Sequence, residues 1–188
     1  KAGIRVGGIL SDANNQLVRP AIRDVSVTGF TSAVVAHDIS TGEYTVAPVG
    51  GCGVFIHRGL GGVMDRCDLR ANYKGLYEAS FHKATTWSFR SCYFHVNSKY
   101  GVQLTDSVSS TFTDQCIFES NTNEGFYCNS TLGATTGGAL TFLTIRDCYF
   151  EDNNTGVVGG FSLVVESGGL VIATYGHLDN INLNTVGA

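Results

Sequence analysis

A short motif that returns five times limits what this chain can fold into. Four copies contain a cysteine and the first has valine in its place, at Val25, Cys67, Cys92, Cys116 and Cys148. The steps between successive cysteines are 25, 24 and 32 residues. A repeat of this length, built from short strand-like runs without helical periodicity, indicates a solenoid in which each repeat buries its apolar face on a neighbour.

Other residues stand at fixed distances from each cysteine position. Two residues later comes an apolar side chain, at Val27, Leu69, Phe94, Phe118 and Phe150. Five residues after each cysteine stands an asparagine and soon afterwards a glycine, at Asn72 and Gly75, Asn97 and Gly101, Asn121 and Gly125, and Asn153 and Gly156. In coils stacked at the strand spacing of about 4.8 Å, equivalent residues form columns. We therefore expect a buried apolar column, asparagine amides that bond from coil to coil in an enclosed turn, and glycines that let the chain bend into the next strand.

The column two residues before the cysteine position alternates in charge. Its members are Arg23, Asp65, Arg90, Asp114 and Arg146. In stacked coils each of these charges has opposite charges above and below it, an order that only in-register stacking explains physically.

The composition favours β structure and excludes two classes of protein. The chain has 24 glycines, 11 phenylalanines, 8 tyrosines and only 2 prolines, which suits strands joined by tight turns. With a net charge of −4 it shows no basic stripe, which argues against a nucleic-acid partner. No apolar run approaches the roughly 18 residues that a membrane-spanning helix needs, and no signal peptide follows Lys1.

The six cysteines are predicted to be free, buried thiols, because four of them occupy the position that valine fills at Val25. Such thiols imply that the chain folds in a reducing compartment. The five histidines show no metal-ligand spacing, so we expect neither a metal site nor a cofactor.

We expect a single domain over residues 1–188, as part of a longer chain. Residues 1–21 are expected to form an opening strand or an irregular first coil, residues 22–158 the regular coils, and residues 159–188 a terminal coil or a cap. Two insertions, at residues 36–53 and 129–138, lengthen the repeat and are expected to protrude as loops.

On its aligned cysteine, phenylalanine, asparagine and glycine columns, over roughly residues 22–158, the chain resembles right-handed parallel β-helix proteins of the pectin-lyase-like class. Within that class it is most similar to the body of bacteriophage tailspikes. The resemblance implies an all-β, right-handed parallel β-helix solenoid of about five to six coils. It also implies assembly in the bacterial cytoplasm, a side-by-side homotrimer in the virion tail, and a bacterial surface polysaccharide as the partner.

Candidate site residues lie in outward columns. Glycoside hydrolysis normally uses two carboxylates, so we interpret Glu119 and Glu151, three residues after their cysteines on neighbouring coils, as the candidate catalytic pair. Tyr93, His95 and Tyr149 are the candidate substrate-binding residues, since an aromatic face suits the apolar face of a sugar ring. Two alternatives stay open. The glutamates can simply extend into solvent, and the tyrosines can fill a trimer interface.

The leading hypothesis is a tailspike-like receptor-binding module that binds a bacterial surface polysaccharide and, as an endoglycosidase-type depolymerase, hydrolyses it. One alternative is a non-catalytic structural or adhesive segment of a fibre. Another is a fragment of a bacterial pectin-lyase-like enzyme, which would be extracellular and monomeric. The calcium-binding carboxylates and catalytic arginine typical of pectate lyases are not recognisable here, which counts against a lyase. A further outward column leans toward an interface and contains Tyr77, Gln103, Tyr127 and Val158.

Overall fold

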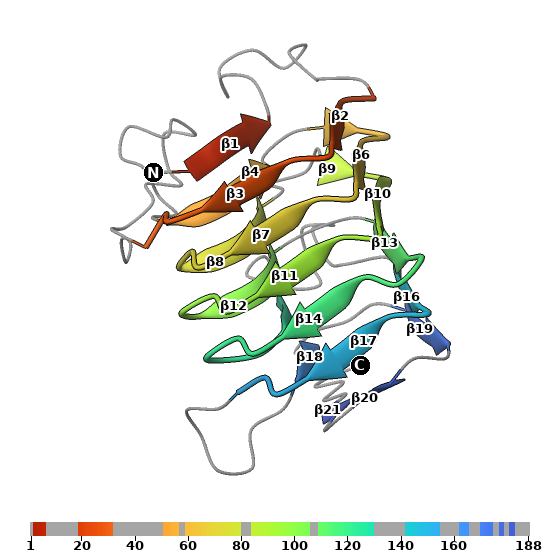
Figure 1. Ribbon diagram of the computed structural model, residues 1–188. Helices are drawn as coiled ribbons and strands as arrows, with labels where there is room; N and C mark the ends of the chain where they lie inside the picture. The colour runs from red at the N-terminus through yellow and green to blue at the C-terminus, as the bar shows by residue number, and fades with distance from the viewer. Residues whose placement is uncertain are drawn as a thin grey trace.

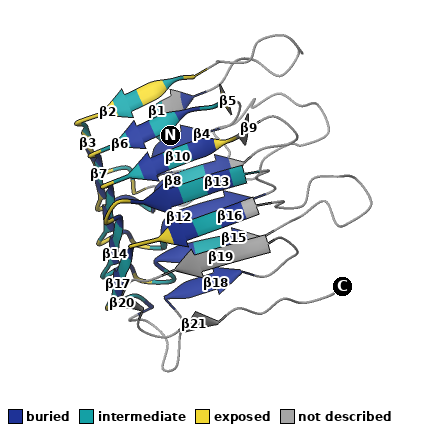
Figure 2. Ribbon diagram, turned by 90° about the vertical axis from the view of Figure 1, so that its right-hand side faces the viewer, coloured by how far each residue is buried: buried dark blue, intermediate teal, exposed yellow. Residues whose placement is uncertain are grey.

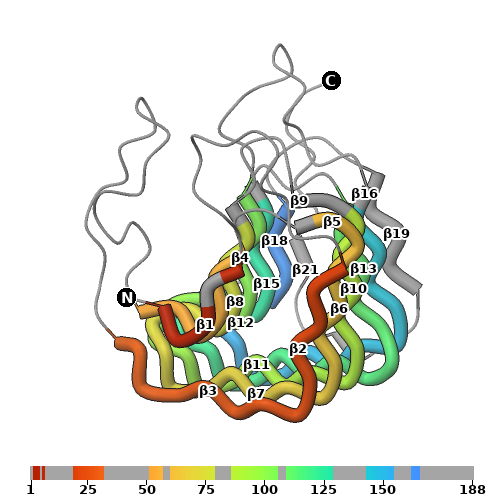
Figure 3. The backbone as a smooth tube through the Cα atoms, turned by 90° about the horizontal axis from the view of Figure 1, so that it is seen from above, coloured from red at the N-terminus to blue at the C-terminus, as the bar shows by residue number. Residues whose placement is uncertain are grey.

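The structure is a computed structural model that describes residues 2–6, 19–31, 51–56, 59–79, 84–105, 109–129, 142–154, 162–165, 170–174, 177–178 and 181–182. Over these ranges the chain forms strands and turns without an α-helix. The strands wind into a stack of coils (Figure 1). Seen along the stack, equivalent strands of successive coils overlie one another on three sides (Figure 3).

Three parallel sheets run along the stack, and each coil passes through sheet 1, sheet 2 and sheet 3 in turn. Sheet 1 contains β2 (Ala21–Arg23), β6 (Val63–Asp65), β10 (Trp87–Arg90), β13 (Ser109–Thr113), β16 (Phe142–Arg146) and β19 (Leu170–Thr174). Sheet 2 contains β3 (Ser26–Thr28), β7 (Asp68–Arg70), β11 (Tyr93–His95), β14 (Ile117–Glu119), β17 (Tyr149–Glu151) and β20 (His177–Leu178). Sheet 3 contains β1 (Ala2–Val6), β4 (Cys52–Ile56), β8 (Lys74–Ala79), β12 (Tyr100–Thr105), β15 (Phe126–Asn129), β18 (Leu163–Val165) and β21 (Ile181–Asn182). A further two-stranded sheet contains β5 (Gly59–Leu60) and β9 (Ala84–Thr85).

The repeats stack in register, as the sequence predicts. Phe94 of β11 pairs with Leu69 of β7 on one side and with Phe118 of β14 on the other. Phe118 pairs in turn with Phe150 of β17. The motif copies therefore lie above one another, and the predicted all-β parallel solenoid is confirmed.

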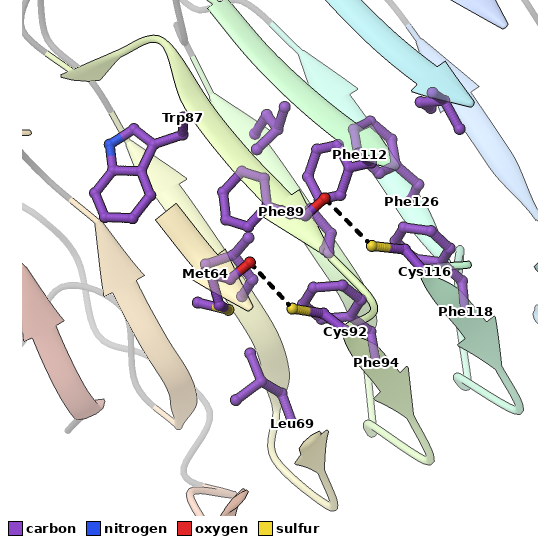
Figure 4. Close-up of a cluster of buried hydrophobic side chains, with 14 of the residues drawn as sticks. Met64, Leu69, Trp87, Phe89, Cys92, Phe94, Phe112, Cys116, Phe118 and Phe126 are labelled. Carbon is purple, nitrogen blue, oxygen red and sulfur yellow. Dashed lines mark hydrogen bonds between the residues drawn. The ribbon is translucent and has the colours of Figure 1, made fainter. Parts of the chain in front are cut away.

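The interior is filled by the predicted apolar column, by a second column from sheet 1 and by apolar side chains of sheet 3 such as Leu76, Val102 and Phe126 (Figure 4). Phe94, Phe118 and Phe150 are fully buried, and their rings stack at centroid distances of 5.2 and 4.4 Å. Phe89 and Phe112 of sheet 1 stack at 4.4 Å. Burying each of these rings stabilises the fold by about 1.5–3 kcal/mol relative to leaving it exposed. Figure 2 shows this burial along β8, β10 and β12, whereas β2 near the end of the stack is partly exposed.

All six cysteines are free and buried, which confirms the sequence prediction. The thiol of Cys92 contacts the carbonyl oxygen of Met64 at 3.6 Å, and the thiol of Cys116 contacts the carbonyl oxygen of Phe89 at 3.5 Å (Figure 4). The neighbouring Cys116 thiol and burial raise the pKa of Cys92 to about 12. The Cys92 thiol therefore remains protonated at neutral pH, and the buried cysteines pack as small apolar side chains.

The turn between sheets 2 and 3 contains the predicted asparagine ladder. The side-chain oxygen of Asn121 accepts from the backbone N–H of Asn97 at 3.1 Å and from its side-chain amide at 2.9 Å. The side-chain amide of Asn121 donates to the carbonyl of Phe94 at 2.9 Å and to the side-chain oxygen of Asn153 at 2.8 Å. Asn97 and Asn121 are fully buried, so these bonds satisfy polar groups that water cannot reach.

The glycines beside this ladder have a different role from the predicted one. Gly75, Gly101 and Gly125 do not adopt positive φ. A Cβ atom on Gly101 would lie 2.5 Å from the carbonyl oxygen of Gly125 and 2.9 Å from the amide nitrogen of Asn121. Glycine is therefore needed because successive coils approach closely here. The positive φ of this turn falls on another column, which contains Gly29, Ala71, Val96, Ser120 and Asp152.

The corner between sheets 1 and 2 departs from the prediction in one coil. Arg23 pairs with Asp65, and Asp65 with Arg90, as predicted. Arg90, however, pairs with Thr113 rather than Asp114. Asp114 and the residue after it both have positive φ, where each other coil has a single such residue. The predicted charge alternation is therefore wrong at Asp114, because one extra turn residue moves it out of the column.

The coil pattern continues on both sides of the regular segment. β1 already pairs with β4. Cys52 and Gly53, which were expected to lie in a loop, are the first residues of β4. After residue 158, β18 completes one coil by pairing with β15, and β19, β20 and β21 pair with the preceding coil. The strands described beyond residue 158 thus continue the coil pattern. The rest of the two expected loops, residues 36–50 and 130–138, lies outside the described residues.

Candidate functional site

The five residues singled out from the sequence lie on the outer side of sheet 2. Tyr93 and His95 belong to β11, Glu119 ends β14, and Tyr149 and Glu151 belong to β17. His95 pairs with Glu119, and Glu119 with Glu151, so these three stand in one column on successive coils. All five side chains are half-buried. The middle residue of each three-residue strand, Phe94, Phe118 or Phe150, points the other way and is buried in the core. Strand alternation therefore brings the five together.

Each of the two glutamates accepts a hydrogen bond from a tyrosine. The Tyr93 hydroxyl donates to Oε2 of Glu119, and the Tyr149 hydroxyl donates to Oε2 of Glu151 at 2.6 Å. Burial and the hydrogen bond to Glu119 raise the pKa of Tyr93 to about 12, so its hydroxyl keeps its proton at neutral pH. Within the described part of the chain, Oε1 of neither glutamate accepts a hydrogen bond.

His95 is held on two sides. Its ring stacks on Tyr93 with a centroid distance of 3.8 Å and an interplanar angle of 11°. Its Nε2 lies 2.9 Å from Oδ1 of Asp68, whose other carboxylate oxygen lies 3.6 Å from Nε of Arg70. Sequence reasoning missed Asp68 as a site residue, although it stands in the same column as Tyr93, one residue after its cysteine.

This face has the groups that sugar binding and glycoside hydrolysis use. Adjacent strands place the backbones of Glu119 and Glu151 about 5 Å apart, so two carboxylates, the groups that glycoside hydrolysis uses, stand on neighbouring coils. The tyrosine hydroxyls restrict the orientation of both carboxylates. The stacked rings of Tyr93 and His95 add a flat aromatic surface. The catalytic and substrate-binding roles themselves stay predictions.

A second group of residues lies on the outer side of sheet 3, beyond the asparagine turn. The predicted column is present as Tyr77, Gln103 and Tyr127. The next partner of Tyr127 is Val164 of β18, and Val158, which the sequence analysis assigned to this place, lies outside the described residues.

Sequence reasoning also missed two lysines beside this column. Lys74 begins β8 and Lys99 directly precedes β12. The available signal was that each lysine adjoins a tyrosine shortly after a ladder asparagine, as Tyr73-Lys74 and Lys99-Tyr100.

Two general features of the described residues bear on function. No group of three or more histidine, cysteine, aspartate or glutamate side chains among them is placed to hold a metal ion. Across the same ranges, no helix has the length and apolar character needed to cross a membrane.

Comparison with protein families matches residues 7–185 to the family described as right handed beta helix region. Searches of the curated proteins and of the solved structures found no match. The family match spans nearly all of the 188 residues, and three stacked parallel sheets have the architecture that the family description names. The predicted right-handed parallel coil is confirmed, and this chain belongs to the right-handed β-helix family.

Proposed function

We propose that this chain is the polysaccharide-binding β-helix module of a tailspike-like protein, and that the outer side of sheet 2 holds the glycan. The observation that carries the proposal is a pair of tyrosine–glutamate hydrogen bonds on this face, one between adjacent strands, from Tyr93 to Glu119, and one within a strand, from Tyr149 to Glu151. A tyrosine ring suits the apolar side of a sugar, and a carboxylate beside it accepts sugar hydroxyls. Because the two pairs lie on successive coils of one face, this face can contact more than one sugar unit of a polysaccharide.

The proposal assigns hydrolysis of the glycan to Glu119 and Glu151. One carboxyl group would protonate the leaving glycosidic oxygen, and the other would attack the sugar or activate a water. Their position on adjacent strands supports this pairing, since the backbone holds both residues in register. The tyrosine hydroxyls would orient the two carboxylates.

The homotrimer, the virion tail and assembly in the bacterial cytoplasm belong to the same proposal. The six free, buried thiols support folding in a reducing compartment. Sedimentation velocity tests the oligomeric state. A trimer supports the tailspike-like assembly, whereas a monomer favours a fragment of an extracellular pectin-lyase-like enzyme.

One observation favours a second function, that of a non-catalytic structural or adhesive segment. Each glutamate already accepts a hydrogen bond from within the protein. Such side chains can serve to stiffen a fibre or to bind a glycan without cleaving it.

Incubation with bacterial capsular and O-antigen polysaccharides distinguishes the two functions by the release of new reducing ends. We expect Glu119→Gln and Glu151→Gln each to lower the rate of release by at least about 100-fold, the usual contribution of a general acid or base. Asp152→Asn is the matched control, because Asp152 is exposed beside Glu151. Release that is unchanged in both glutamine variants would exclude this catalytic pair. Binding by the unmodified chain without release would support the second function.

A further inference from the structure

Two lysines lie over tyrosine rings on the outer side of sheet 3, next to the asparagine turn. Nζ of Lys74 lies 4.1 Å from the centroid of the Tyr77 ring. Nζ of Lys99 lies 4.9 Å from the centroid of Tyr100 and 5.6 Å from that of Tyr73. Ammonium groups in such positions are attracted by the negative faces of the rings. The two lysines are thus held in defined places rather than extended freely into solvent.

Neither lysine forms an ion pair with a carboxylate in the part of the chain that the structure describes. Lys74 is only 8% exposed, and its burial together with the charge of Lys99 lowers its pKa to about 8. The Glu124 carboxylate, in the next coil, accepts a hydrogen bond from the side-chain amide of Asn154 at 3.4 Å. A nearly buried cation beside a second cation is unfavourable unless an anion neutralises them. Two of the chain's four lysines thus lie close together over tyrosine rings, and they form a local positive charge on a chain whose net charge is −4.

The same face holds an unsatisfied hydrogen-bond acceptor. Gln103 stands in register between Tyr77 and Tyr127 and is 9% exposed. Its side-chain amide donates to the Thr105 hydroxyl at 3.2 Å. Its Oε1 is buried and accepts no hydrogen bond from the described residues. Because buried polar atoms are normally paired, this oxygen is a natural partner for a ligand hydroxyl.

We propose that this lysine–tyrosine cluster, made up of Lys74, Lys99, Tyr77, Gln103, Tyr100 and Tyr127, binds an acidic sugar of a glycan chain. The anionic group of the sugar would lie near Lys99, which is the more exposed lysine, and would also neutralise Lys74. A hydroxyl of the sugar would donate to Oε1 of Gln103.

The aromatic rings favour a sugar over a small inorganic anion. Tyr100 and Tyr127 stack with a centroid distance of 4.8 Å and an interplanar angle of 12°, which makes an extended aromatic surface beside the charges. A sulfate or phosphate ion would use the lysines alone, whereas a sugar ring would also pack against this surface. The outer side of sheet 2, by contrast, carries the carboxylates of Asp68, Glu119 and Glu151, which repel an acidic sugar. The cluster is therefore a site separate from the proposed catalytic face, and it shares with the proposed function only the assumption that the ligand is a glycan.

Isothermal titration calorimetry with the whole chain tests this site. The probes are an oligogalacturonate, a neutral dextran oligosaccharide of the same length, dextran sulfate and sodium sulfate. We expect the oligogalacturonate to bind and the neutral oligosaccharide to bind at least tenfold more weakly. Dextran sulfate shows whether a sulfate ester replaces the carboxylate, and either acidic glycan supports the site. Sodium sulfate that binds as tightly as the glycans would overturn the sugar assignment.

Lys74→Met and Lys99→Met remove the charges and keep side chains of similar length. We expect each variant to weaken binding of the oligogalacturonate at least tenfold. Arg146→Met, a change at an exposed arginine of sheet 1, is the charge-matched control and should bind as the unmodified chain does. Thermal unfolding confirms that each variant is folded. Unchanged affinity in both lysine variants, or equal affinity for the neutral oligosaccharide, would overturn the proposal. This test measures the binding of an acidic oligosaccharide and not the release of reducing ends, so its failure would leave the proposed hydrolysis at sheet 2 untouched.

Discussion

The two tight corners of each coil follow the repeat to different degrees. At the corner between sheets 2 and 3, the asparagines keep one member per coil from Asn72 to Asn153, joined by hydrogen bonds. At the corner between sheets 1 and 2, an extra residue moves Asp114 out of the charge column. Both corners use positive φ, so backbone conformation does not explain the difference.

Burial does explain it. Asn72, Asn97 and Asn121 are fully buried, whereas Asp114 is exposed. A buried amide that loses its partner in the next coil keeps the full cost of its desolvation, but an exposed carboxylate exchanges its partner for water. The asparagine corner therefore enforces register. It also joins the two faces on which we propose ligand sites, and so it sets their relative orientation.

The largest effect is expected from Asn121→Ala. This change leaves two donors of Asn97 and the carbonyl of Phe94 without their partner inside the turn. At about 1–3 kcal/mol for each unsatisfied buried group, we expect the free energy of unfolding to fall by about 4 kcal/mol. Urea unfolding followed by circular dichroism measures it. Thr122→Ala, at the exposed next residue, is the control, and an equal loss in both variants would contradict the comparison.

The next largest effect is expected from Gly101→Ala. The new Cβ would lie 2.5 Å from a backbone oxygen of the next coil, so the coils must separate locally. Overpacking of this kind costs about 3 kcal/mol. Gly29→Ala is the control that measures the cost of positive φ alone. Gly29 has φ of +86°, and no atom lies within 4 Å of the added Cβ. We expect the second change to cost only about 1 kcal/mol in the same unfolding measurement. The opposite order would show that the glycines act through φ.

Val96→Asn is expected to stabilise the asparagine corner. Val96 has φ of +53° and is 55% exposed, a conformation that disfavours a β-branched side chain. Asparagine tolerates this region, so we expect the free energy of unfolding to rise by about 1 kcal/mol. Arg70→Asn serves as the control, because Arg70 is also exposed but ends strand β7 without positive φ. This change should give no gain.

A smaller gain is expected at the charged corner from Thr113→Asp. Thr113 stands in register with Arg90, whose Nε is buried and has no acceptor among the described residues. A carboxylate at this position would restore the charge alternation, but Thr113 is only 6% exposed, so desolvation offsets most of the attraction to Arg90. We expect the free energy of unfolding to rise by only about 0.5 kcal/mol. Thermal melting at low salt and in 1 M NaCl checks it, because salt should weaken the gain. A gain that persists at high salt would point to packing instead.

The smallest effect is expected from Arg66→Met. Arg66 donates to both carboxylate oxygens of Asp24, at 2.7 and 2.9 Å, and this hydrogen bonding lowers the pKa of Asp24 from its ordinary value of 3.8. A lowered folded-state pKa gives stability that is present above pH 3.8 and is lost as the pH falls through the lowered value. Both side chains are exposed, so the change in melting temperature at pH 7 should be slight and should shrink further in acid. A melting temperature that falls by more than that of Gly29→Ala would contradict the ranking of the two corners.

Much of the fold and part of the candidate site followed from spacing alone. The distance of each phenylalanine and asparagine from its cysteine does not change between coils, so equivalent residues meet as neighbours in adjacent strands. The same argument placed Glu119 beside Glu151 and put Tyr93 and His95 on the same side of sheet 2. The prediction from spacing failed at Asp114. The turn before Cys116 has one extra residue, and a count back from the cysteine does not show that the strand already ends at Thr113.

The amino-acid sequence by itself determined the coil, its buried columns and the column to which each candidate residue belongs, since a strict repeat converts distance along the chain into distance along the stack. The tertiary structure decided contacts between columns: the hydroxyl of Tyr93 on Glu119, the ring of His95 on Tyr93, and the burial of Lys74 over Tyr77. These contacts depend on the length and rotamer of each side chain, which decide whether it reaches the next column, and on its exposure to water. Neither quantity is encoded in the spacing of the repeat.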